Sequence, residues 1–564
     1  MTADDCLSTE ADWIEPSPVI ERRGDAVYIR SAVPLDNPDQ HLIDLLNRAA
    51  RTWPDRRFLA ERAPDGEGWV GVSHGDFARR VASAAGGLRD RVAPGDRVVL
   101  ALRNSVDAAV ATFAVMALGG VVAPLAPALL DNPDGHARLN AAIRVIGASL
   151  IVTEAGAEND LGAPILPLAR ATAAGMTPWY LDQAASWIQP SDAAKILFTS
   201  GSTGRPKPVV NTHGMLTASA AMVAQTLHRL PEGVPHVQVD WLPWHHTFGG
   251  NVNLHAALST GGSIHIDQGA PTPAAFALTL RNLAEIGPTG ISTVPAAFSM
   301  LLEAVKADDE LAAAVFRNLY SASSGGAALA PATIEALQAV AIASGGHRLL
   351  FGGGYGMTET AGIITRLDWP TPRHDLLGFP LPGVEIKLVD QGEGRFECRV
   401  RGPNVFAGYE GEAEAPFDEE GFFPTGDAVA PATPDGWEEG FVYAGRLVED
   451  FKLANGTWVR AGALRAALLT HFGPVVRDVL IVGEGRDRVG CLVLPGATPL
   501  SKGRLEDKIA AFNRDRRGVS AVIGPVAVFA SVPDPATGEL TTKGTLNTVQ
   551  SRWVRSEEID AMYA

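Results

Sequence analysis

A loop rich in glycine and hydroxyl side chains is the segment of this sequence best suited to chemistry. Residues 198–207 read FTSGSTGRPK and follow a short apolar run that is typical of a strand. Glycines let backbone N–H groups approach a ligand closely, while the hydroxyls and the Lys207 ammonium supply further donors. The loop can therefore wrap a polyphosphate, although a solvated turn is the alternative for the loop alone. It does not match the phosphate loop G-x-x-x-x-G-K-[ST], and no intact G-x-G-x-x-G fingerprint stands out after a strand.

Four further segments follow this loop and together point to a family. They read SSGGAAL at 323–329, YGMTE at 355–359, TGD at 425–427 and GRLVEDFKLANG at 445–456. With TSGSTGRPK they resemble, in the same order, the motifs of the adenylate-forming superfamily of acyl-CoA and aryl-CoA synthetases, adenylation domains and firefly-type luciferases. The resemblance covers nearly the whole chain. It implies an α/β fold: a large N-terminal domain of layered α/β subdomains with a small antiparallel β part, and a small, mobile C-terminal α+β domain.

The resemblance also implies a two-step reaction. A carboxylate attacks the α-phosphate of ATP, which gives an acyl-AMP and pyrophosphate, and the thiol of coenzyme A then displaces AMP. The implied cofactors are ATP, Mg²⁺ and coenzyme A, and the implied substrate is a small carboxylic acid. Catalysis of this kind depends mainly on positioning and on charge stabilisation.

The matching motifs allow the nucleotide-binding residues of the superfamily to be assigned to individual positions of this sequence. Thr358 is expected to bond an α-phosphate oxygen, and Glu359 offers the hard carboxylate that Mg²⁺ prefers, with Thr199 as a second metal contact. Asp427 is expected to accept both ribose hydroxyls. Ordinary alternatives remain for each: a cap-region charge for Glu359 and a turn aspartate for Asp427. The residues expected to contact the nucleotide are Thr199, Ser200, Gly201, Ser202, Thr203, Gly204, Lys207, Gly325, Gly326, Ala327, Tyr355, Gly356, Thr358, Asp427 and Arg446.

The acid is expected to lie against residues from two segments. WLPWHHTFGGN at 241–251 places His246, by alignment, at the wall between acyl pocket and thiol channel. The neighbouring aromatics could equally be core residues, and the pair His245 and His246 lacks further ligands at metal-site spacing. The glycines at 352–354 would leave a surface for a flat acid, although close strand packing explains glycines too. The residues expected to contact the acid are Trp241, Trp244, His246, Phe248, Gly353 and Gly354.

The C-terminal motifs depart from the common pattern. Between Arg446 and Gly456 the chain has one residue more than most superfamily members, so the hinge position falls on Val448 or Glu449, and we favour Glu449 and Asp450 as the hinge pair. Lys543, in TKG, is the best match to the catalytic lysine of adenylation, with Lys452 as the rival and a surface lysine as the plain alternative. The expected catalytic residues are therefore Lys543, His246, Thr358 and Glu359.

Within the superfamily, three segments resemble those of feruloyl-CoA synthetases, which are AMP-forming ligases of hydroxycinnamic acids. These are WLPWHHTFGGN, the following IDQGAPTP and EDFKLANGTWV. The resemblance predicts an aryl-CoA ligase. The alternatives are a ligase of aliphatic acids and a nucleotide sensor without catalysis. Loading of a carrier protein is disfavoured, because the sequence contains neither a G-x-D-S-L carrier motif nor a reductase domain.

The elements that must position these residues show α/β alternation. From about residue 40, helical stretches at 41–51, 75–89 and 106–118 alternate with β-branched runs at 97–102, 120–124 and 149–153. Short strands between 378 and 443 suggest a small antiparallel sheet or barrel. We place a domain boundary at about residue 447, which gives an N-terminal domain over 1–447 that binds ATP and acid, and a mobile C-terminal domain over 448–564.

Composition and charge narrow the class of protein. With 564 residues and 46% hydrophobic side chains the chain must bury a large core. A net charge of -17 is the wrong sign for broad nucleic-acid binding. Three scattered cysteines, an N-terminus without a signal sequence and the glycine- and proline-interrupted apolar stretch 108–130 favour a cytoplasmic protein without membrane insertion. A homodimer stays open.

Overall fold

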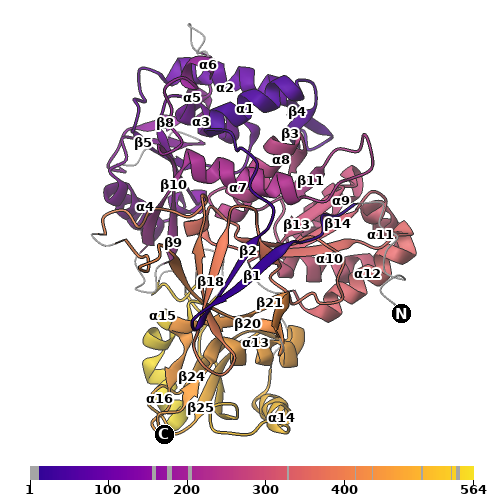
Figure 1. Cartoon of the computed structure of the whole chain (residues 1–564), viewed down its shortest axis with the longest axis vertical. Helices are drawn as coiled ribbons and strands as arrows, with labels where there is room; N and C mark the ends of the chain where they lie inside the picture. The colour runs from indigo at the N-terminus through magenta and orange to yellow at the C-terminus, as the bar shows by residue number, and fades with distance from the viewer. Residues whose placement is uncertain are drawn as a thin grey trace.

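The architecture is that of a large α/β part with a smaller part at one end (Figure 1). The computed structural model describes residues 12–154, 161–174, 181–200, 206–326, 329–412, 415–434, 436–496, 500–534, 537–540 and 546–564. No helix in these ranges is both long and apolar enough to cross a membrane. The apolar stretch 108–130 instead forms most of a buried helix, a turn and a buried strand, as predicted.

Two mixed sheets form the first half of the large part. The six-stranded sheet, in the order β10-β9-β6-β5-β7-β8, is parallel except for β10. Its strands are β5 (Arg97–Ala101), β6 (Val121–Leu125), β7 (Leu150–Thr153), β8 (Ile165–Pro167), β9 (Ala193–Ser200) and β10 (Pro206–Thr212). The four-stranded sheet, β11-β12-β3-β4, contains β3 (Arg57–Arg62), β4 (Trp69–Ser73), β11 (Val237–Asp240) and β12 (Ser263–Ile266).

Amphipathic and apolar helices cover these sheets, and several of them begin at a side chain that accepts a hydrogen bond from a free N–H group of the first turn. Ser105 accepts from Ala108 N at the start of α3, and Thr212 accepts from Met215 N at the start of α7. The helices of this half are α1 (Leu42–Thr52), α2 (His74–Leu88), α3 (Val106–Ala117), α4 (Pro133–Ile146), α5 (Leu168–Ala171), α6 (Leu181–Ala184), α7 (His213–Thr226), the π-helix η3 (Phe248–Asn253) and α8 (Leu254–Thr260).

A five-stranded sheet forms the second half and supplies much of the predicted site. Its order is β13-β14-β15-β16-β17, and β13, β14 and β15 run parallel. The strands are β13 (Gly290–Thr293), β14 (Ser321–Ser324), β15 (Leu350–Tyr355), β16 (Thr365–Leu367) and β17 (Phe379–Pro380). Its helices are α9 (Phe276–Ile286), α10 (Pro295–Ala307), α11 (Asp309–Phe316) and α12 (Pro331–Gly345).

The predicted antiparallel part is a six-stranded sheet that also takes in the beginning of the chain. Its order is β1-β2-β18-β19-β20-β21, and every pair is antiparallel. The strands are β1 (Pro18–Arg23), β2 (Ala26–Ser31), β18 (Glu385–Asp390), β19 (Phe396–Arg401), β20 (Phe423–Thr433) and β21 (Gly436–Arg446). The first two strands were not predicted; β1 pairs with β2, and β2 pairs with β18, a strand more than 350 residues away.

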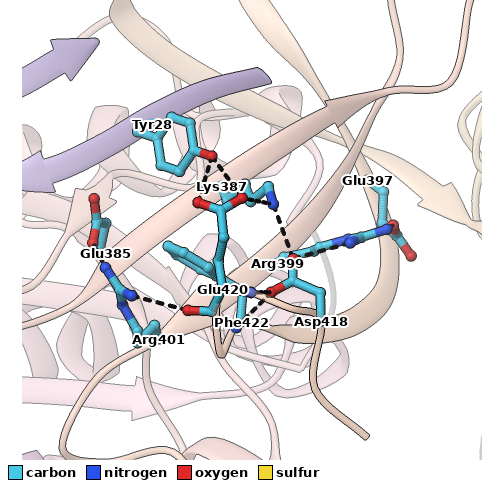
Figure 2. A network of polar contacts seen from close by, with 9 residues as sticks. All are labelled: Tyr28, Glu385, Lys387, Glu397, Arg399, Arg401, Asp418, Glu420 and Phe422. Carbon is cyan, nitrogen blue, oxygen red and sulfur yellow. Dashed lines mark hydrogen bonds and ion pairs between the residues drawn. The ribbon is translucent and has the colours of Figure 1, made fainter. Parts of the chain in front are cut away.

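A network of charges fixes the loop that precedes β20 (Figure 2). Lys387 and Arg399 each donate to one carboxylate oxygen of Asp418 at 3.0 Å, and Tyr28 donates to Glu420 at 2.9 Å. Burial alone would raise the pKa of Asp418, but a backbone N–H group and the two cations lower it to about 2. These bonds connect the loop to β2, β18 and β19. They thereby fix the start of β20, the strand that carries Asp427, which is predicted to bind the ribose of the nucleotide.

The C-terminal part has a core of its own. The first residue of that core along the chain is Phe451, whereas the last residue in the three cores of the large part is Phe441. Residue 447, where we place the domain boundary, lies between these two residues. Figure 1 shows this part in orange and yellow at one end of the molecule. Its elements are β22 (Phe451–Lys452), β23 (Trp458–Val459), α13 (Ala461–Phe472), β24 (Val476–Val482), β25 (Val489–Pro495), α14 (Lys502–Asn513), β26 (Ile523–Val528), α15 (Thr548–Val554) and α16 (Ser556–Tyr563).

Candidate active site

The β9–β10 hairpin places two predicted phosphate contacts side by side. Thr199 and Lys207 are register partners on the antiparallel strands that flank the glycine-rich loop. Lys207 Nζ lies 2.6 Å from Glu412 Oε1 and 4.8 Å from the centroid of the Tyr409 ring. The loop residues Gly201, Ser202, Thr203 and Gly204 lie outside the described residues, as does Ala327 of the predicted adenine-side loop.

Thr358 and Glu359 lie on a short 3-10 turn, η4 (Thr358–Thr360), shortly after the end of β15. The Glu359 side chain accepts a hydrogen bond from the Tyr409 hydroxyl at 2.9 Å. Its backbone carbonyl accepts from Phe406 N at 2.8 Å, which anchors the turn to the following loop. Glu359 is only 7% exposed, and burial raises the pKa of its carboxyl group. A buried carboxylate whose ionised form is destabilised in this way is suited to a cation that arrives with the substrate.

Asp427 gathers three donors from two strands: Tyr355 lies on β15, and Tyr443 and Arg446 lie on β21. It accepts from Tyr355 Oη at 2.7 Å and from Tyr443 Oη at 3.3 Å, and Arg446 Nε lies 3.3 Å away. Asp427 and Arg446 are register partners on β20 and β21, so the antiparallel pairing itself brings them together. Burial raises the pKa of Asp427 and the Arg446 charge opposes this effect. The structure thus unites three predicted nucleotide residues, Tyr355, Asp427 and Arg446.

The donor set suits Mg²⁺ bound together with a phosphate chain rather than in a protein cage. Within the described ranges, no three His, Cys, Asp or Glu side chains are grouped closely enough to hold a metal. Mg²⁺ is typically bound through one or two carboxylates, with phosphate and water oxygens completing an octahedron. The buried carboxylate of Glu359 fits such a shared site, because its charge needs compensation that the neutral Tyr409 hydroxyl does not provide.

A row of small and polar residues lies where the carboxylic acid substrate is expected to bind. Thr293, Ser324 and Gly353 are register partners across β13, β14 and β15, so they lie in one row on one face near the carboxyl ends of parallel strands. Trp241 donates from its indole nitrogen to Thr293 Oγ1 at 3.1 Å, which sets its ring beside this row. The Ser324 hydroxyl is buried and has no hydrogen-bond partner among the described residues. Ligands commonly bind at this end of parallel strands.

The three glycines that precede Tyr355 do not share one explanation. A side chain at Gly352 would lie 2.5 Å from the carbonyl of Leu367, and one at Gly354 would lie 2.9 Å from that of Thr365. The pairing with β16 therefore accounts for both, as the packing alternative had it. At Gly353 the nearest atom is Ser324 O at 3.6 Å, an ordinary contact distance. The missing side chain at Gly353 is thus not required by packing.

The segment with His246 packs against the motif at 323–329. Gly325 lies so close to Phe248 that a side chain on the glycine would meet the ring at 2.7 Å. The rings of His245 and His246 lie 4.5 Å apart, and burial followed by the His246 charge lowers the pKa of His245 to about 3. Trp244 is anchored by its backbone N–H, which donates to Asn104 Oδ1 at 3.0 Å. The structure therefore places Phe248 beside the predicted adenine-side loop.

The predicted hinge is held by arginines from both sides. The Asp450 side chain is 2% exposed, with Arg395 Nη1 at 2.7 Å and Arg460 Nη1 at 3.3 Å from the same carboxylate oxygen. The carbonyl of Glu449 accepts from Arg552 Nη2 at 2.8 Å. Arg395 directly precedes β19 in the large part, whereas Arg460 directly precedes α13 in the small part.

The two candidate lysines differ in what the structure says of them. Lys543 lies outside the described residues. The chain on either side of it is brought together, since Leu540 and Leu546 form an antiparallel bridge and Asn547 N donates to Glu539 O at 2.8 Å. Lys452 lies on β22 with its ammonium 4.9 Å from the centroid of the Trp458 ring.

Sequence reasoning missed two tyrosines of this site. Tyr409 contacts both Lys207 and Glu359, and Tyr443 contacts Asp427. Tyr443 stands three residues before Arg446 on β21, so an antiparallel pairing of TGD with that strand could have suggested it. For Tyr409, nothing in the spacing of the residues indicates the contact.

Comparisons with known proteins show the family of this chain. The family described as AMP-binding enzyme matches residues 46–410, and its C-terminal domain matches residues 450–564. The probable CoA ligase CCL8 of Humulus lupulus is 29% identical over 57% of this chain, but the chain spans only 54% of that relative. The anthranilate–CoA ligase of Pseudomonas aeruginosa is 29% identical over 75% of this chain and 81% of its own length.

Solved structures share the fold. The o-succinylbenzoate CoA synthetase (MenE) of Bacillus subtilis, in complex with the acyl-adenylate intermediate OSB-AMP, superimposes with a TM-score of 0.71. The sequence identity is 20%, and the match covers 91% of this chain and 98% of that structure. The predicted combination of a large N-terminal α/β domain and a small C-terminal domain is therefore confirmed.

Proposed function

This chain belongs to the AMP-binding enzyme family and is an AMP-forming acid–CoA ligase, and we propose that its acid is aromatic, of the hydroxycinnamic, feruloyl type. The observation that carries this proposal is the row formed by Thr293, Ser324 and Gly353. Trp241 flanks the row, and the absent side chain at Gly353 serves no packing need. A flat ring can use such a space, and the Ser324 hydroxyl, which has no hydrogen-bond partner among the described residues, can meet a polar ring substituent.

In the first step the residues mainly position ATP and the acid. Thr199, Lys207 and the glycine-rich loop would hold the outer phosphates, while Asp427 would hold the ribose through its buried carboxylate. Thr358 would donate to an α-phosphate oxygen as the carboxylate attacks and pyrophosphate leaves. Mg²⁺, when bound at Glu359, neutralises phosphate charge and makes pyrophosphate a better leaving group. Lys543 would supply a positive charge where negative charge develops.

In the second step coenzyme A would displace AMP after the small part has turned. The 448–564 domain would rotate about Glu449 and Asp450, removing Lys543 and opening a path along His246. The thiol sulfur then attacks the acyl carbonyl, AMP leaves with the bond electrons, and the thiol proton passes to solvent or to AMP. Each product is thus accounted for by one displacement at phosphorus and one at carbon.

An acid panel tests the substrate class. With ATP, Mg²⁺ and coenzyme A present, we expect kcat/KM for hydroxycinnamic acids to exceed that for octanoate about tenfold or more, because apolar pockets discriminate by a few kcal/mol at most. Release of pyrophosphate and AMP measures the reaction. An aliphatic ligase would show octanoate or longer acids equal to or better than the aryl acids, and a sensor would release no pyrophosphate with any acid.

Substitution of Gly353 tests the acid site itself. Gly353→Ala should lower kcat/KM for hydroxycinnamic acids about tenfold, since one added methyl group in a closed pocket has this order of effect. The KM for ATP should stay the same. Gly503→Ala is the matched control, because a side chain there meets nothing within 4 Å and the position lies on α14. Equal kinetics of Gly353→Ala and the parent enzyme would remove Gly353 from the acid site.

A further inference from the structure

Lys195 is a buried lysine that the proposed reaction does not use. It lies on β9, is 2% exposed, and forms no ion pair with any described residue. Its ammonium donates to the backbone carbonyl of Gly250 at 2.9 Å and to Asn251 Oδ1 at 2.8 Å, both of which are neutral acceptors. Burial lowers its pKa to about 7. A buried charge without a counter-charge destabilises a fold, so stability alone does not explain a lysine here.

A chain of hydrogen bonds leads from Lys195 to the turn that carries Thr358 and Glu359, which we call the catalytic turn. Asn251 Nδ2 donates to Asn211 Oδ1 at 2.9 Å, and Asn211 Nδ2 donates to the backbone carbonyl of Thr358 at 3.1 Å. Lys195 and Asn211 are register partners on β9 and β10, so the hairpin fixes both ends of this chain of bonds. We call Lys195, Asn251 and Asn211 the buried amide chain. It joins the strand of the phosphate loop to the turn that carries Thr358 and Glu359.

The same bonds hold an unusual helix. Gly250 and Asn251 belong to η3, a π-helix, and such helices are rare and frequent at functional sites. This helix begins at Phe248, two residues after His246. It also packs tightly against the segment after Glu359, since a side chain at Gly362 would lie 2.6 Å from Val252. One ammonium therefore bonds to the helix on the acid side, and through two amides to the turn on the phosphate side.

We propose that Lys195 is a positioning residue that sets η3 and the Thr358–Glu359 turn relative to each other, so that the acid carboxylate meets the α-phosphate at attacking distance. This rests on the proposed ligase reaction. Lys195 touches neither substrate and acts through Asn251 and Asn211. A displacement of about 1 Å between two reactants can cost about 100-fold in rate, so a loosened amide chain should lower kcat while substrate affinity changes little.

The test compares Lys195→Met, Asn211→Ala and the double variant, with adenylation measured by pyrophosphate exchange on the best acid of the panel. We expect Lys195→Met to keep or raise Tm, to lower the adenylation kcat at least tenfold, and to change KM for ATP less than threefold. The double variant should be no more than threefold slower than the slower single variant, because members of one network are not additive. Independent, multiplying effects or an unchanged kcat would overturn the proposal.

A matched control separates positioning from loss of stability. Gln338 is a buried amide on α12 that bonds the backbone of Leu349 in both directions, and neither bond belongs to the buried amide chain. Gln338→Met should lower Tm without lowering the adenylation kcat at a temperature where the protein stays folded. If Gln338→Met lowered kcat as much as Lys195→Met, the removal of any buried polar side chain would have this effect. That result would contradict the proposal.

A second readout does not depend on which acid is used. Amide hydrogen exchange of Lys195→Met should lose protection both in 248–253 and in 357–363, at least tenfold in each. Should Lys195→Met not fold, Asn211→Ala must show the loss in 357–363. Unchanged exchange in 357–363 for the folded variants overturns the proposal even if the enzyme activates aryl acids as proposed. If no acid is activated but the two segments loosen together, the ligase proposal fails while the coupling stands.

Discussion

Replacing Lys543 with alanine is expected to abolish acyl-adenylate formation while leaving thioester formation from supplied acyl-AMP and coenzyme A within a fewfold of the parent enzyme. The lysine is proposed to contact the acid and the α-phosphate only during adenylation, and a charge contact made in a water-poor transition state typically contributes a factor of about 100 to 1,000 in rate. Both half-reactions are measured on the same preparation, the first by pyrophosphate exchange and the second by thioester release.

Lys452→Ala is the matched control for this experiment. Its ammonium lies over the Trp458 ring, so its removal should cost little in the first half-reaction. Normal adenylation by Lys543→Ala together with a defect in Lys452→Ala would transfer the role to Lys452. Equal loss of both half-reactions in Lys543→Ala would contradict a lysine that serves only one of two domain orientations.

Glu359→Gln is expected to lower the adenylation kcat about 100-fold with the fold intact. The substitution keeps the shape of the side chain and removes the charge that a Mg²⁺ ion needs. Because burial already raises the pKa of the Glu359 carboxyl group, a neutral amide should not lower Tm. Activity is measured over a titration of Mg²⁺, since a weakened metal site shifts the half-saturating concentration upward.

Tyr409→Phe is the control for Glu359. It removes the hydroxyl that donates to the carboxylate at 2.9 Å but leaves the negative charge in place. We expect a fewfold effect on kcat, which one neutral hydrogen bond accounts for. Parent-like activity of Glu359→Gln at every Mg²⁺ concentration would show that the metal is held elsewhere.

The nucleotide side of the site could be predicted because its residues lie within short motifs. TGD places Asp427 within β20 and GRLVED places Arg446 at the end of β21, and the pairing of these two strands makes Asp427 and Arg446 neighbours without further requirements. The π-helix and its lysine could not be found in this way. Lys195 stands in an otherwise apolar run, KILF, and only the folded hairpin shows that its ammonium reaches Gly250 and Asn251.

The acid side and the antiparallel sheet show the limit of local patterns. Thr293, Ser324 and Gly353 lie about 30 residues apart in the sequence, and their alignment in one row depends on the register of three parallel strands. A glycine run gives the same signal whether a neighbouring strand or a ligand needs the space, so Gly353 could not be separated from Gly352 by sequence. The strand β2 pairs with β18, and no local sequence pattern predicts a strand partner so distant in the chain.

The two arginines that contact Asp450 affect the free-energy cost of the proposed rotation of the small part. Removing one partner of a buried ion pair costs about 3 to 5 kcal/mol when the other charge is left alone, which would slow a rotation by a factor of about 100 to 1,000 or more. Arg395 belongs to the large part and Arg460 to the small part, and both contact the same carboxylate oxygen. If the proposed rotation about Asp450 releases one guanidinium, the other can stay in contact, so the Asp450 carboxylate would keep one counter-charge throughout the rotation.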